Sequence, residues 1–254
     1  MGVMRKRIKP IVVYVVLALL GLALVIANIH NTSKQQAHLQ NVKSAIPYAT
    51  TPKTTTSRTS SSSDEELILN PIIDLSGWQL PQDIDYDVLS NHISGAIVRV
   101  FGGSLISKDS NAASSNGVDK SFKTHIKELK KRDVPVAVYS YAQGTSVKEM
   151  KEEARIFYKN ASPYKPTYYW IDVEEETMSN MEQGVQAFLA ELKRLGAEKV
   201  GLYIGAYFML EQEVSTKNFD AVWIPAYGTD SGYYEALPNT EIDYDLHQYT
   251  SQGS

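Results

Sequence analysis

Two carboxylates stand two residues apart at the end of a short apolar and aromatic run. Asp172 and Glu174 follow Tyr168-Tyr169-Trp170-Ile171. Alternate side chains of a β-strand share a face, so both carboxylates point the same way. Burial and like charge raise the pKa of at least one of them, as a general acid requires. Glycosidases use such an acid to protonate the leaving oxygen, although a solvent-exposed acidic strand end would show the same triplet.

The composition removes many other kinds of reactive group. The 254-residue chain has no cysteine, which excludes disulfides, thiolate nucleophiles and iron–sulfur sites. Its five histidines lie far apart and match no metal-binding spacing. A formal charge of −4 gives no reason to expect nucleic-acid binding. The chemistry is therefore expected to rest on carboxylates, hydroxyls and aromatic rings.

These groups need a scaffold, and the apolar pattern from Leu67 onward predicts an α/β domain. Helical spacing of apolar residues is clearest at 181–195 and also marks 122–129 and 150–157. Strands that alternate with helices indicate a parallel sheet with crossover helices. About seven strands, with no G-x-G-x-x-G after the first, favour a (β/α) barrel over a dinucleotide-binding sheet. The expected strands are 71–75, 96–100, 134–141, 168–173, 200–204, 221–226 and 246–249.

Polar and aromatic side chains gather at the predicted strand ends, where an α/β barrel builds its active site. Asp74 lies at the end of the first strand, and Tyr or Trp residues follow at most of the others. Their rings combine a flat apolar face with a polar atom, which suits a sugar ring, while core packing is the alternative for any single ring. The candidate substrate-binding residues are Trp78, Arg99, Tyr139, Tyr141, Tyr203, Trp223 and Tyr227.

The first thirty residues have the pattern of a membrane anchor. Four basic residues between positions 5 and 9 precede an uncharged run at 11–27. As a helix this run would span roughly 26 Å, the short end of a bilayer crossing. The basic cluster predicts that the N-terminus stays in the cytoplasm and that the rest lies outside. A cleaved signal peptide is the alternative, but no A-x-A-like site follows Ala27.

A second composition change separates this anchor from the α/β domain. Between residues 50 and 63, eleven of fourteen residues are Ser or Thr, which leaves almost nothing apolar to bury. Such a segment is typical of a flexible spacer. The expected organisation is therefore a basic stub and transmembrane helix at 1–30, a linker at 31–66 and a barrel domain at 67–254.

Short motifs follow one another in a fixed order along the domain. They are Asp74-Leu75-Ser76, Gln79, Ile84-Asp85-Tyr86, Ile97-Val98-Arg99, the Asp119 and Phe122 pair, Val136–Tyr139, Asp172-Val173-Glu174, Leu202-Tyr203, Trp223–Tyr227 and His247–Ser251. In this order and spacing, over some 180 residues, the region from Ile72 to Ser251 resembles the glycoside hydrolase family 25 lysozymes, the Chalaropsis-type muramidases.

The resemblance implies a modified (β/α) barrel that cleaves the β-1,4 bond between N-acetylmuramic acid and N-acetylglucosamine in peptidoglycan. By the same resemblance Glu174 would be the proton donor, Asp172 would assist it, and Asp74 would line the same site. Gln248 would join the substrate-binding residues. No metal or organic cofactor is implied. With the anchor, the expected location is the outer side of a bacterial cytoplasmic membrane, with the glycan strands of the cell wall as partner.

The sequence also departs from the family. Ser140 stands where many members have His, and His247 replaces the usual Trp before Gln248. The family continues into a closing strand with a further Asp, so that carboxylate is expected either beyond Ser254 or from another residue.

Two alternatives to a muramidase stay open. One is a cell-wall glycan-binding protein that keeps the barrel without turnover. The other is a chitinase-like hydrolase, although the full D-x-x-D-x-D-x-E signature is absent.

Overall fold

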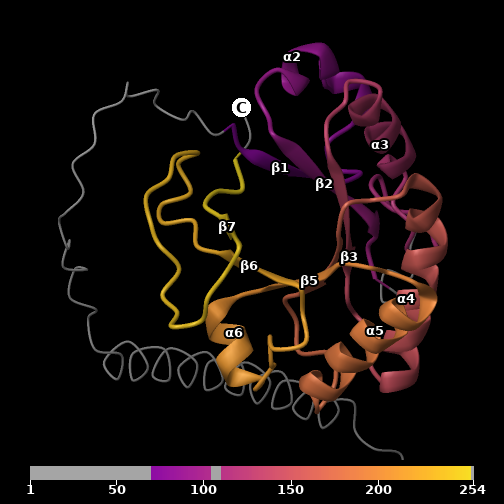
Figure 1. Ribbon diagram of the computed structural model, residues 1–254, viewed down its shortest axis with the longest axis vertical. Coiled ribbons are helices and arrows are strands. Elements are labelled where there is room, and N and C mark those ends of the chain that lie inside the picture. Colours follow the sequence, from indigo (N-terminus) through magenta and orange to yellow (C-terminus); the bar gives the residue numbers. More distant parts are fainter. Residues whose placement is uncertain (1–69, 104–109, 253–254) are drawn as a thin grey trace, which may run out of the picture. The chain divides into compact units, whose positions relative to one another are not determined.

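Seven parallel strands form one sheet, and each strand pairs with the strand before it in the sequence (Figure 1). The computed structural model describes residues 70–103 and 110–252. The strands are β1 (Ile72–Leu75), β2 (Gly95–Phe101), β3 (Val136–Tyr141), β4 (Tyr169–Val173), β5 (Val200–Ile204), β6 (Ala221–Pro225) and β7 (Leu246–Gln248). All seven coincide with the apolar runs from which strands are predicted.

The sheet curls into a half-barrel whose two end strands are β1 and β7 (Figure 1). The predicted parallel α/β architecture is confirmed, and its form is a curled sheet with two free ends in the described part of the chain. The described residues all belong to one compact unit of the chain, residues 65–254. The predicted span at 11–27 and linker at 31–66 lie outside the described residues. Within those residues no helix has the length and apolarity for crossing a membrane.

Helices stand along one side of the sheet (Figure 1). The three predicted helices are confirmed, and sequence reasoning missed the short α2 and α6 and the 3-10 turns. Side-chain caps begin the two longest: Ser146 Oγ accepts from the Glu149 N–H before α4, and Asn180 Oδ1 accepts from the Gln183 N–H before α5. The helical elements are η1 (Pro81–Asp83), α2 (Tyr86–Ser90), α3 (Phe122–Lys130), α4 (Val147–Ala161), η2 (Ser162–Tyr164), α5 (Met181–Leu195) and α6 (Ala206–Glu211).

Strand alternation divides the buried side chains between the two faces of the sheet. On β4, Ile171 and Val173 belong to the large core that includes Phe157 of α4 and Phe188 of α5. Trp170, which precedes Ile171 and therefore points to the opposite face, belongs to a separate cluster on the concave face. The helix side of the sheet therefore supplies most of the apolar burial. The concave side is left for aromatic and ionisable groups.

Packing on the concave face depends on a residue without a side chain. Gly201 of β5 lies beside Trp170 of β4, and a Cβ at Gly201 would stand 2.3 Å from the indole ring. Trp170 also stacks on Tyr168 and meets Trp223 edge to face, at centroid distances of 5.6 and 5.7 Å. The glycine thus lets the indole lie flat against its neighbouring strand.

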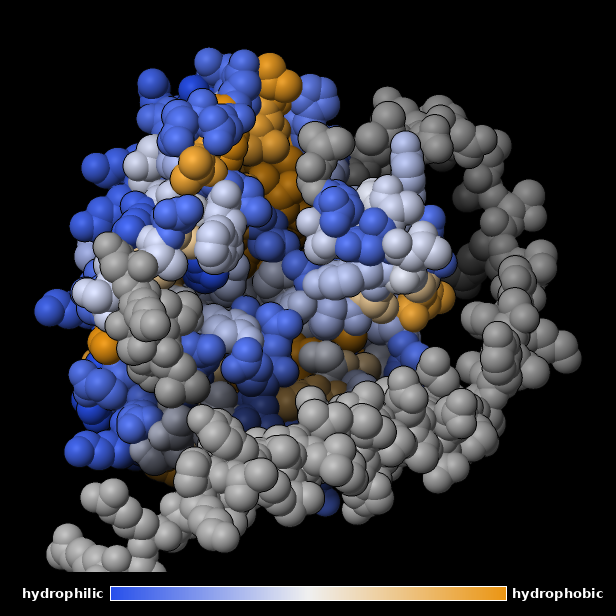
Figure 2. All heavy atoms as spheres, turned by 180° about the vertical axis from the view of Figure 1, so that it is seen from behind, coloured by the Kyte–Doolittle hydropathy of each residue, from blue (hydrophilic) through white to orange (hydrophobic). Residues whose placement is uncertain are grey.

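Figure 2 shows the side of the domain that faces away in Figure 1. This face is largely hydrophilic, with hydrophobic side chains gathered at the end of the domain that carries α2. Leu80 and Val88 are among the exposed large apolar side chains. Most of the other exposed large apolar or aromatic side chains are tyrosines or Trp78, which combine apolar and polar surface.

Replacing Gly201 by Ala is expected to lower the free energy of unfolding by about 1–3 kcal/mol, because the new methyl group must displace the Trp170 ring. Urea unfolding followed by tryptophan fluorescence measures this change. Gly95→Ala in β2 is the matched control, since its nearest contact would be an ordinary 3.4 Å. Equal stability of the two variants would contradict the packing role of Gly201.

Candidate active site

Three carboxyl groups meet at the C-terminal ends of the strands. Asp172 lies in β4, Glu174 is the first residue after this strand, and Asp74 lies in β1. Asp172 is 6% exposed, and its Oδ1 atom is buried without a hydrogen-bond partner among the described residues. Parallel strands bring their C-terminal ends to one edge of a sheet, which explains why residues a hundred positions apart belong to one site.

Burial dominates the titration of all three groups. It raises the pKa of Asp172 well above its usual value, and the charge of Glu174 adds to this rise. It also raises the pKa of Glu174 and of Asp74. A hydrogen bond between Asp172 and Glu174 raises the pKa of the first and lowers that of the second. Raised pKa values keep carboxyl groups protonated to higher pH, which is the condition that a general acid must meet.

Asp74 is tied to the far end of the sheet. Gln248 of β7 donates from Nε2 to Asp74 Oδ2 over 2.8 Å. The Oε1 atom of the same amide accepts from Tyr203 Oη at 2.7 Å and from Tyr227 Oη at 2.6 Å. Four of the predicted site residues, from β1, β5, β7 and the segment after β6, thus form one hydrogen-bonded network.

Tyr139 and Arg99 lie beside the acidic pair. Burial raises the pKa of Tyr139 well above its usual value, and the charge of Asp172 adds to it. Arg99 has the opposite effect on both groups, because its positive charge lowers the pKa of Asp172 and of Tyr139. Its guanidinium is held by Asp119, with Nε donating to Oδ2 over 3.0 Å. A cation on β2 thus limits the cost of burying the carboxyl groups.

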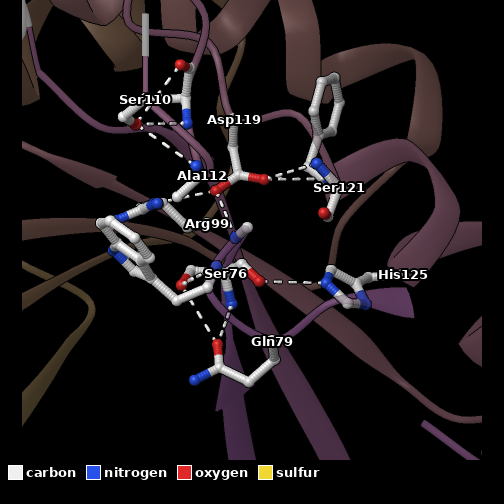
Figure 3. Close-up of polar contacts among 12 residues, drawn as sticks. Ser76, Gln79, Arg99, Ser110, Ala112, Asp119, Ser121 and His125 are labelled. Carbon is white, nitrogen blue, oxygen red and sulfur yellow. Dashed lines mark hydrogen bonds and ion pairs between the residues drawn. The ribbon is translucent and has the colours of Figure 1, made fainter. Parts of the chain in front are cut away.

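Asp119 organises the loop that follows Asp74 (Figure 3). Besides Arg99, its Oδ2 accepts from the Gly77 N–H over 2.7 Å. Its Oδ1 accepts from the N–H groups of Ser121 and Phe122 at the start of α3. The side chain is 0% exposed, so every one of these bonds forms without competition from water. In the sequence Asp119 matches a family motif, but nothing there indicates that it holds this loop.

His125 of α3 holds the same loop in place by a hydrogen bond to Ser76 (Figure 3). Its Nε2–H donates to the Ser76 carbonyl over 3.1 Å, and its Nδ1 accepts from the Tyr86 hydroxyl over 2.6 Å. Burial lowers the pKa of His125, which keeps the ring neutral as this arrangement requires. A signal existed in the sequence: His125 falls on the apolar stripe of α3 with Phe122 and Leu129.

The remaining predicted aromatic residues occupy different surroundings. Trp223 is 7% exposed and packs edge to face on Tyr203 at a centroid distance of 4.6 Å. Tyr141 donates to Glu175 Oε1 over 2.8 Å. Trp78 is 62% exposed and follows Gly77 in the loop that Asp119 holds. Substrate binding by these three residues stays a prediction.

The two family departures also take definite places. Ser140 is 0% exposed, and its neighbours in β3, Tyr139 and Tyr141, alternate with it to the other face of the sheet. Position 140 therefore faces the helix layer. His247 donates from Nε2 to the Ala226 carbonyl over 2.9 Å, which ties β7 to the end of β6.

Comparison with known proteins decides the family. The sequence profile described as glycosyl hydrolases family 25 matches residues 73–254. The chain belongs to this family. It is accordingly a glycoside hydrolase, and the three carboxyl groups occupy the expected end of a family 25 fold. No curated protein sequence matches the chain significantly.

Solved structures of other family members resemble the domain. A family 25 glycosyl hydrolase of Streptococcus pneumoniae, GHIP, described as a virulence factor participating in host cell invasion, is 57% identical. The alignment covers 73% of this chain and 81% of that one, with a TM-score of 0.71. The catalytic domain of endolysin ply40 from a Listeria monocytogenes phage is 26% identical over 72% and 85%, with a TM-score of 0.61. The modular autolysin LytC of Streptococcus pneumoniae, solved with a synthetic peptidoglycan ligand, is 21% identical over 72% and 43%, with a TM-score of 0.53, and shows the fold alone.

The described residues contain no group of three or more His, Cys, Asp or Glu side chains that could hold a metal ion. The carboxyl groups of the site can themselves supply acid–base chemistry. Lysozymes perform the same chemistry with two carboxyl groups in different surroundings.

Raised carboxyl pKa values make a prediction about stability. A carboxyl group with a raised folded-state pKa contributes stability below its unfolded pKa, and this contribution is lost as the pH rises through the folded value. Asp172→Asn removes the ionisation and is expected to stabilise the domain by an amount on the order of 1 kcal/mol at neutral pH. The gain over wild type should grow as the pH rises above the unfolded pKa of an aspartate, about 4, as thermal unfolding can measure.

Glu191→Gln is the opposite control. Hydrogen bonds from Arg194 and Arg155 lower the pKa of Glu191 to about 2, so its charge contributes stability above its unfolded pKa. The variant should therefore lose stability at neutral pH. A loss of stability in Asp172→Asn as well would contradict the raised pKa of Asp172.

Proposed function

We propose that the domain is a muramidase, which cleaves the β-1,4 bond between N-acetylmuramic acid and N-acetylglucosamine in peptidoglycan. The observation that carries this proposal is that Asp172 and Glu174 lie two residues apart with raised pKa values, with Asp74 at the same end of the sheet. Family membership supports it, as do related structures solved with a peptidoglycan ligand or analogue.

Glu174 is assigned the role of proton donor to the glycosidic oxygen. It is the less buried member of the pair, so it is the one that an incoming glycan can contact. Burial raises the pKa of Glu174, so this carboxyl group keeps its proton to a higher pH than a free glutamate does. When the leaving oxygen takes a proton from Glu174, the charge that appears on the pair is partly balanced by Arg99.

The position of Asp172 limits its role. Residues two apart on a strand have Cα atoms about 6.6 Å apart and nearly parallel side chains, so Asp172 flanks Glu174 and does not face it across a sugar. This arrangement suits an assisting group that orients the 2-acetamido substituent, whose carbonyl oxygen attacks the anomeric carbon in substrate-assisted families. Asp74 comes from another strand and is the alternative, as the base that activates water in an inverting reaction. The anomer of the product, observed by NMR, distinguishes the two routes.

Glu174→Gln is expected to lower the turnover of purified peptidoglycan by about 10²–10⁴-fold, because the amide cannot supply the proton. Release of reducing sugar measures turnover, and sedimentation with insoluble walls measures binding, which should persist. Glu176→Gln is the matched control: this exposed carboxylate lies two residues further on and accepts a hydrogen bond from Gln212 Nε2. Unchanged turnover in Glu174→Gln would defeat the assignment. Wall binding without turnover in the wild type would favour the glycan-binding alternative.

We also propose that the chain is tethered by its N-terminal segment, with the domain outside the cytoplasm. The support is sequence alone: the basic cluster before residue 11, the apolar run at 11–27 and the Ser/Thr-rich segment at 50–63. In this location the domain would face the cell wall.

Protease added to intact spheroplasts is expected to release the domain in soluble form, because the Ser/Thr-rich segment at 50–63 has almost nothing apolar to bury. Immunoblotting of the soluble and membrane fractions follows the cleavage. Protease added to lysed cells is the control for intrinsic susceptibility. A domain protected in intact spheroplasts, or a mature N-terminus near residue 30, would overturn the anchor.

A further inference from the structure

Gln248 makes the longest-range polar contact of the site. Its Nε2 atom donates to Asp74 Oδ2 over 2.8 Å, although the two residues are 174 positions apart. Its Oε1 atom receives the hydroxyls of Tyr203 and Tyr227, whose oxygens are 3.3 Å apart. The side chain therefore stands between one acidic group and two phenols.

Hydrogen-bond chemistry allows only one orientation of this amide beside an ionised Asp74. A carboxylate has acceptors alone, so the amide must present its NH₂ group to Asp74 and its oxygen to the tyrosines. Burial raises the pKa of both phenols, so Tyr203 and Tyr227 keep their protons and can both donate to Oε1. Two hydroxyl protons fill the two lone pairs of the amide oxygen. The two tyrosine hydroxyls thereby prevent a flip of the Gln248 amide.

We propose that Gln248 is a positioning residue that fixes the Asp74 carboxylate in the active site, and that Tyr203 and Tyr227 hold Gln248 in the orientation this requires. The inference rests on the proposed function, because it assigns Asp74 a part in glycan cleavage. It differs from the sequence-based expectation for Gln248, which is direct contact with substrate. In the structure both polar atoms of the amide already have protein partners.

The surroundings of Asp74 explain why it needs such a donor. Asp172 and Glu174 of the β4 end oppose its charge, since Asp74 raises the pKa of both. Tyr139 and Tyr227 face it as neutral phenols whose pKa values its charge raises. Arg99, the cation of this cluster, is already bonded to Asp119. The hydrogen bond from Gln248 lowers the pKa of Asp74 against the effect of burial.

Gln248→Met keeps the approximate size of the side chain and removes both polar atoms. We expect kcat on purified peptidoglycan to fall about 100-fold with little change in KM, because a small displacement of a reacting group has this effect. The acidic limb of the pH–rate profile should move up by about one pH unit, since Asp74 loses the donor that favours its charged form. Gln248→Glu places a carboxyl against Asp74 and should move the limb further in the same direction.

Gln252→Met is the matched control, because the Gln252 amide also donates to an aspartate, Asp230, but on the exposed surface. Its kcat and pH profile should equal those of the wild type. Titration of the Asp74 carboxyl by carbon-13 NMR gives a second readout that needs no turnover, and Gln248→Met should raise its pKa relative to wild type.

The outcomes separate this inference from the proposed function. A raised KM with unchanged kcat and pH profile in Gln248→Met would overturn it and make Gln248 a substrate-binding residue. An unchanged pKa of Asp74 in that variant would overturn it as well. If wild type fails to cleave peptidoglycan, the proposed function fails, while the NMR titration still decides whether Gln248 controls Asp74.

Discussion

Asp172 and Glu174 lie two residues apart at the end of a buried strand, where burial raises the pKa of both, and the rest of the domain makes this arrangement possible. Two carboxyl groups on one strand face repel each other and lose hydration, so they persist only in a scaffold that is stable without them. The apolar contacts between the helices and the convex face of the sheet supply that stability. The concave face can therefore carry ionisable groups, and the positive charge of Arg99 partly offsets the negative charge of the carboxyl groups.

That compensating charge is itself held by a chain of buried contacts. Arg99 is fixed by Asp119, and Asp119 also receives backbone N–H groups from the loop after β1 and from the start of α3. A single buried carboxylate thus connects the cation beside the acidic pair with the loop that carries Trp78. Fully bonded buried groups of this kind restrict a loop to one conformation. The loop after β1 is therefore held in place beside the carboxyl groups by buried hydrogen bonds.

Much of the fold could be predicted because it depends on local patterns. The spacing of Phe122, Ile126 and Leu129 fixes a helix, and the alternation of apolar residues fixes strands, through neighbours only a few positions away. Asp172 and Glu174 could be paired for the same reason. The short helices α2 and α6 have too few residues to show such a period.

The side-chain network was beyond sequence reasoning because it depends on strand register. Gln248 meets Asp74, and Asp119 meets Gly77, only when seven strands have the observed order and curl. The family resemblance drew attention to most of these residues. It could not say whether Gln248 contacts a glycan or another side chain, because a glutamine at this position is compatible with both roles.

The order of the strands has a consequence for how the domain folds. Each strand pairs with its predecessor, so the sheet can grow by successive neighbouring contacts that close only short loops. The bond between Asp74 and Gln248 is different, because it joins residues 174 positions apart. The entropy cost of bringing these two residues together is small only after the intervening strands have paired, because the free chain between them is then short. A chain whose sheet is incomplete therefore lacks the hydrogen-bonded network around Asp74.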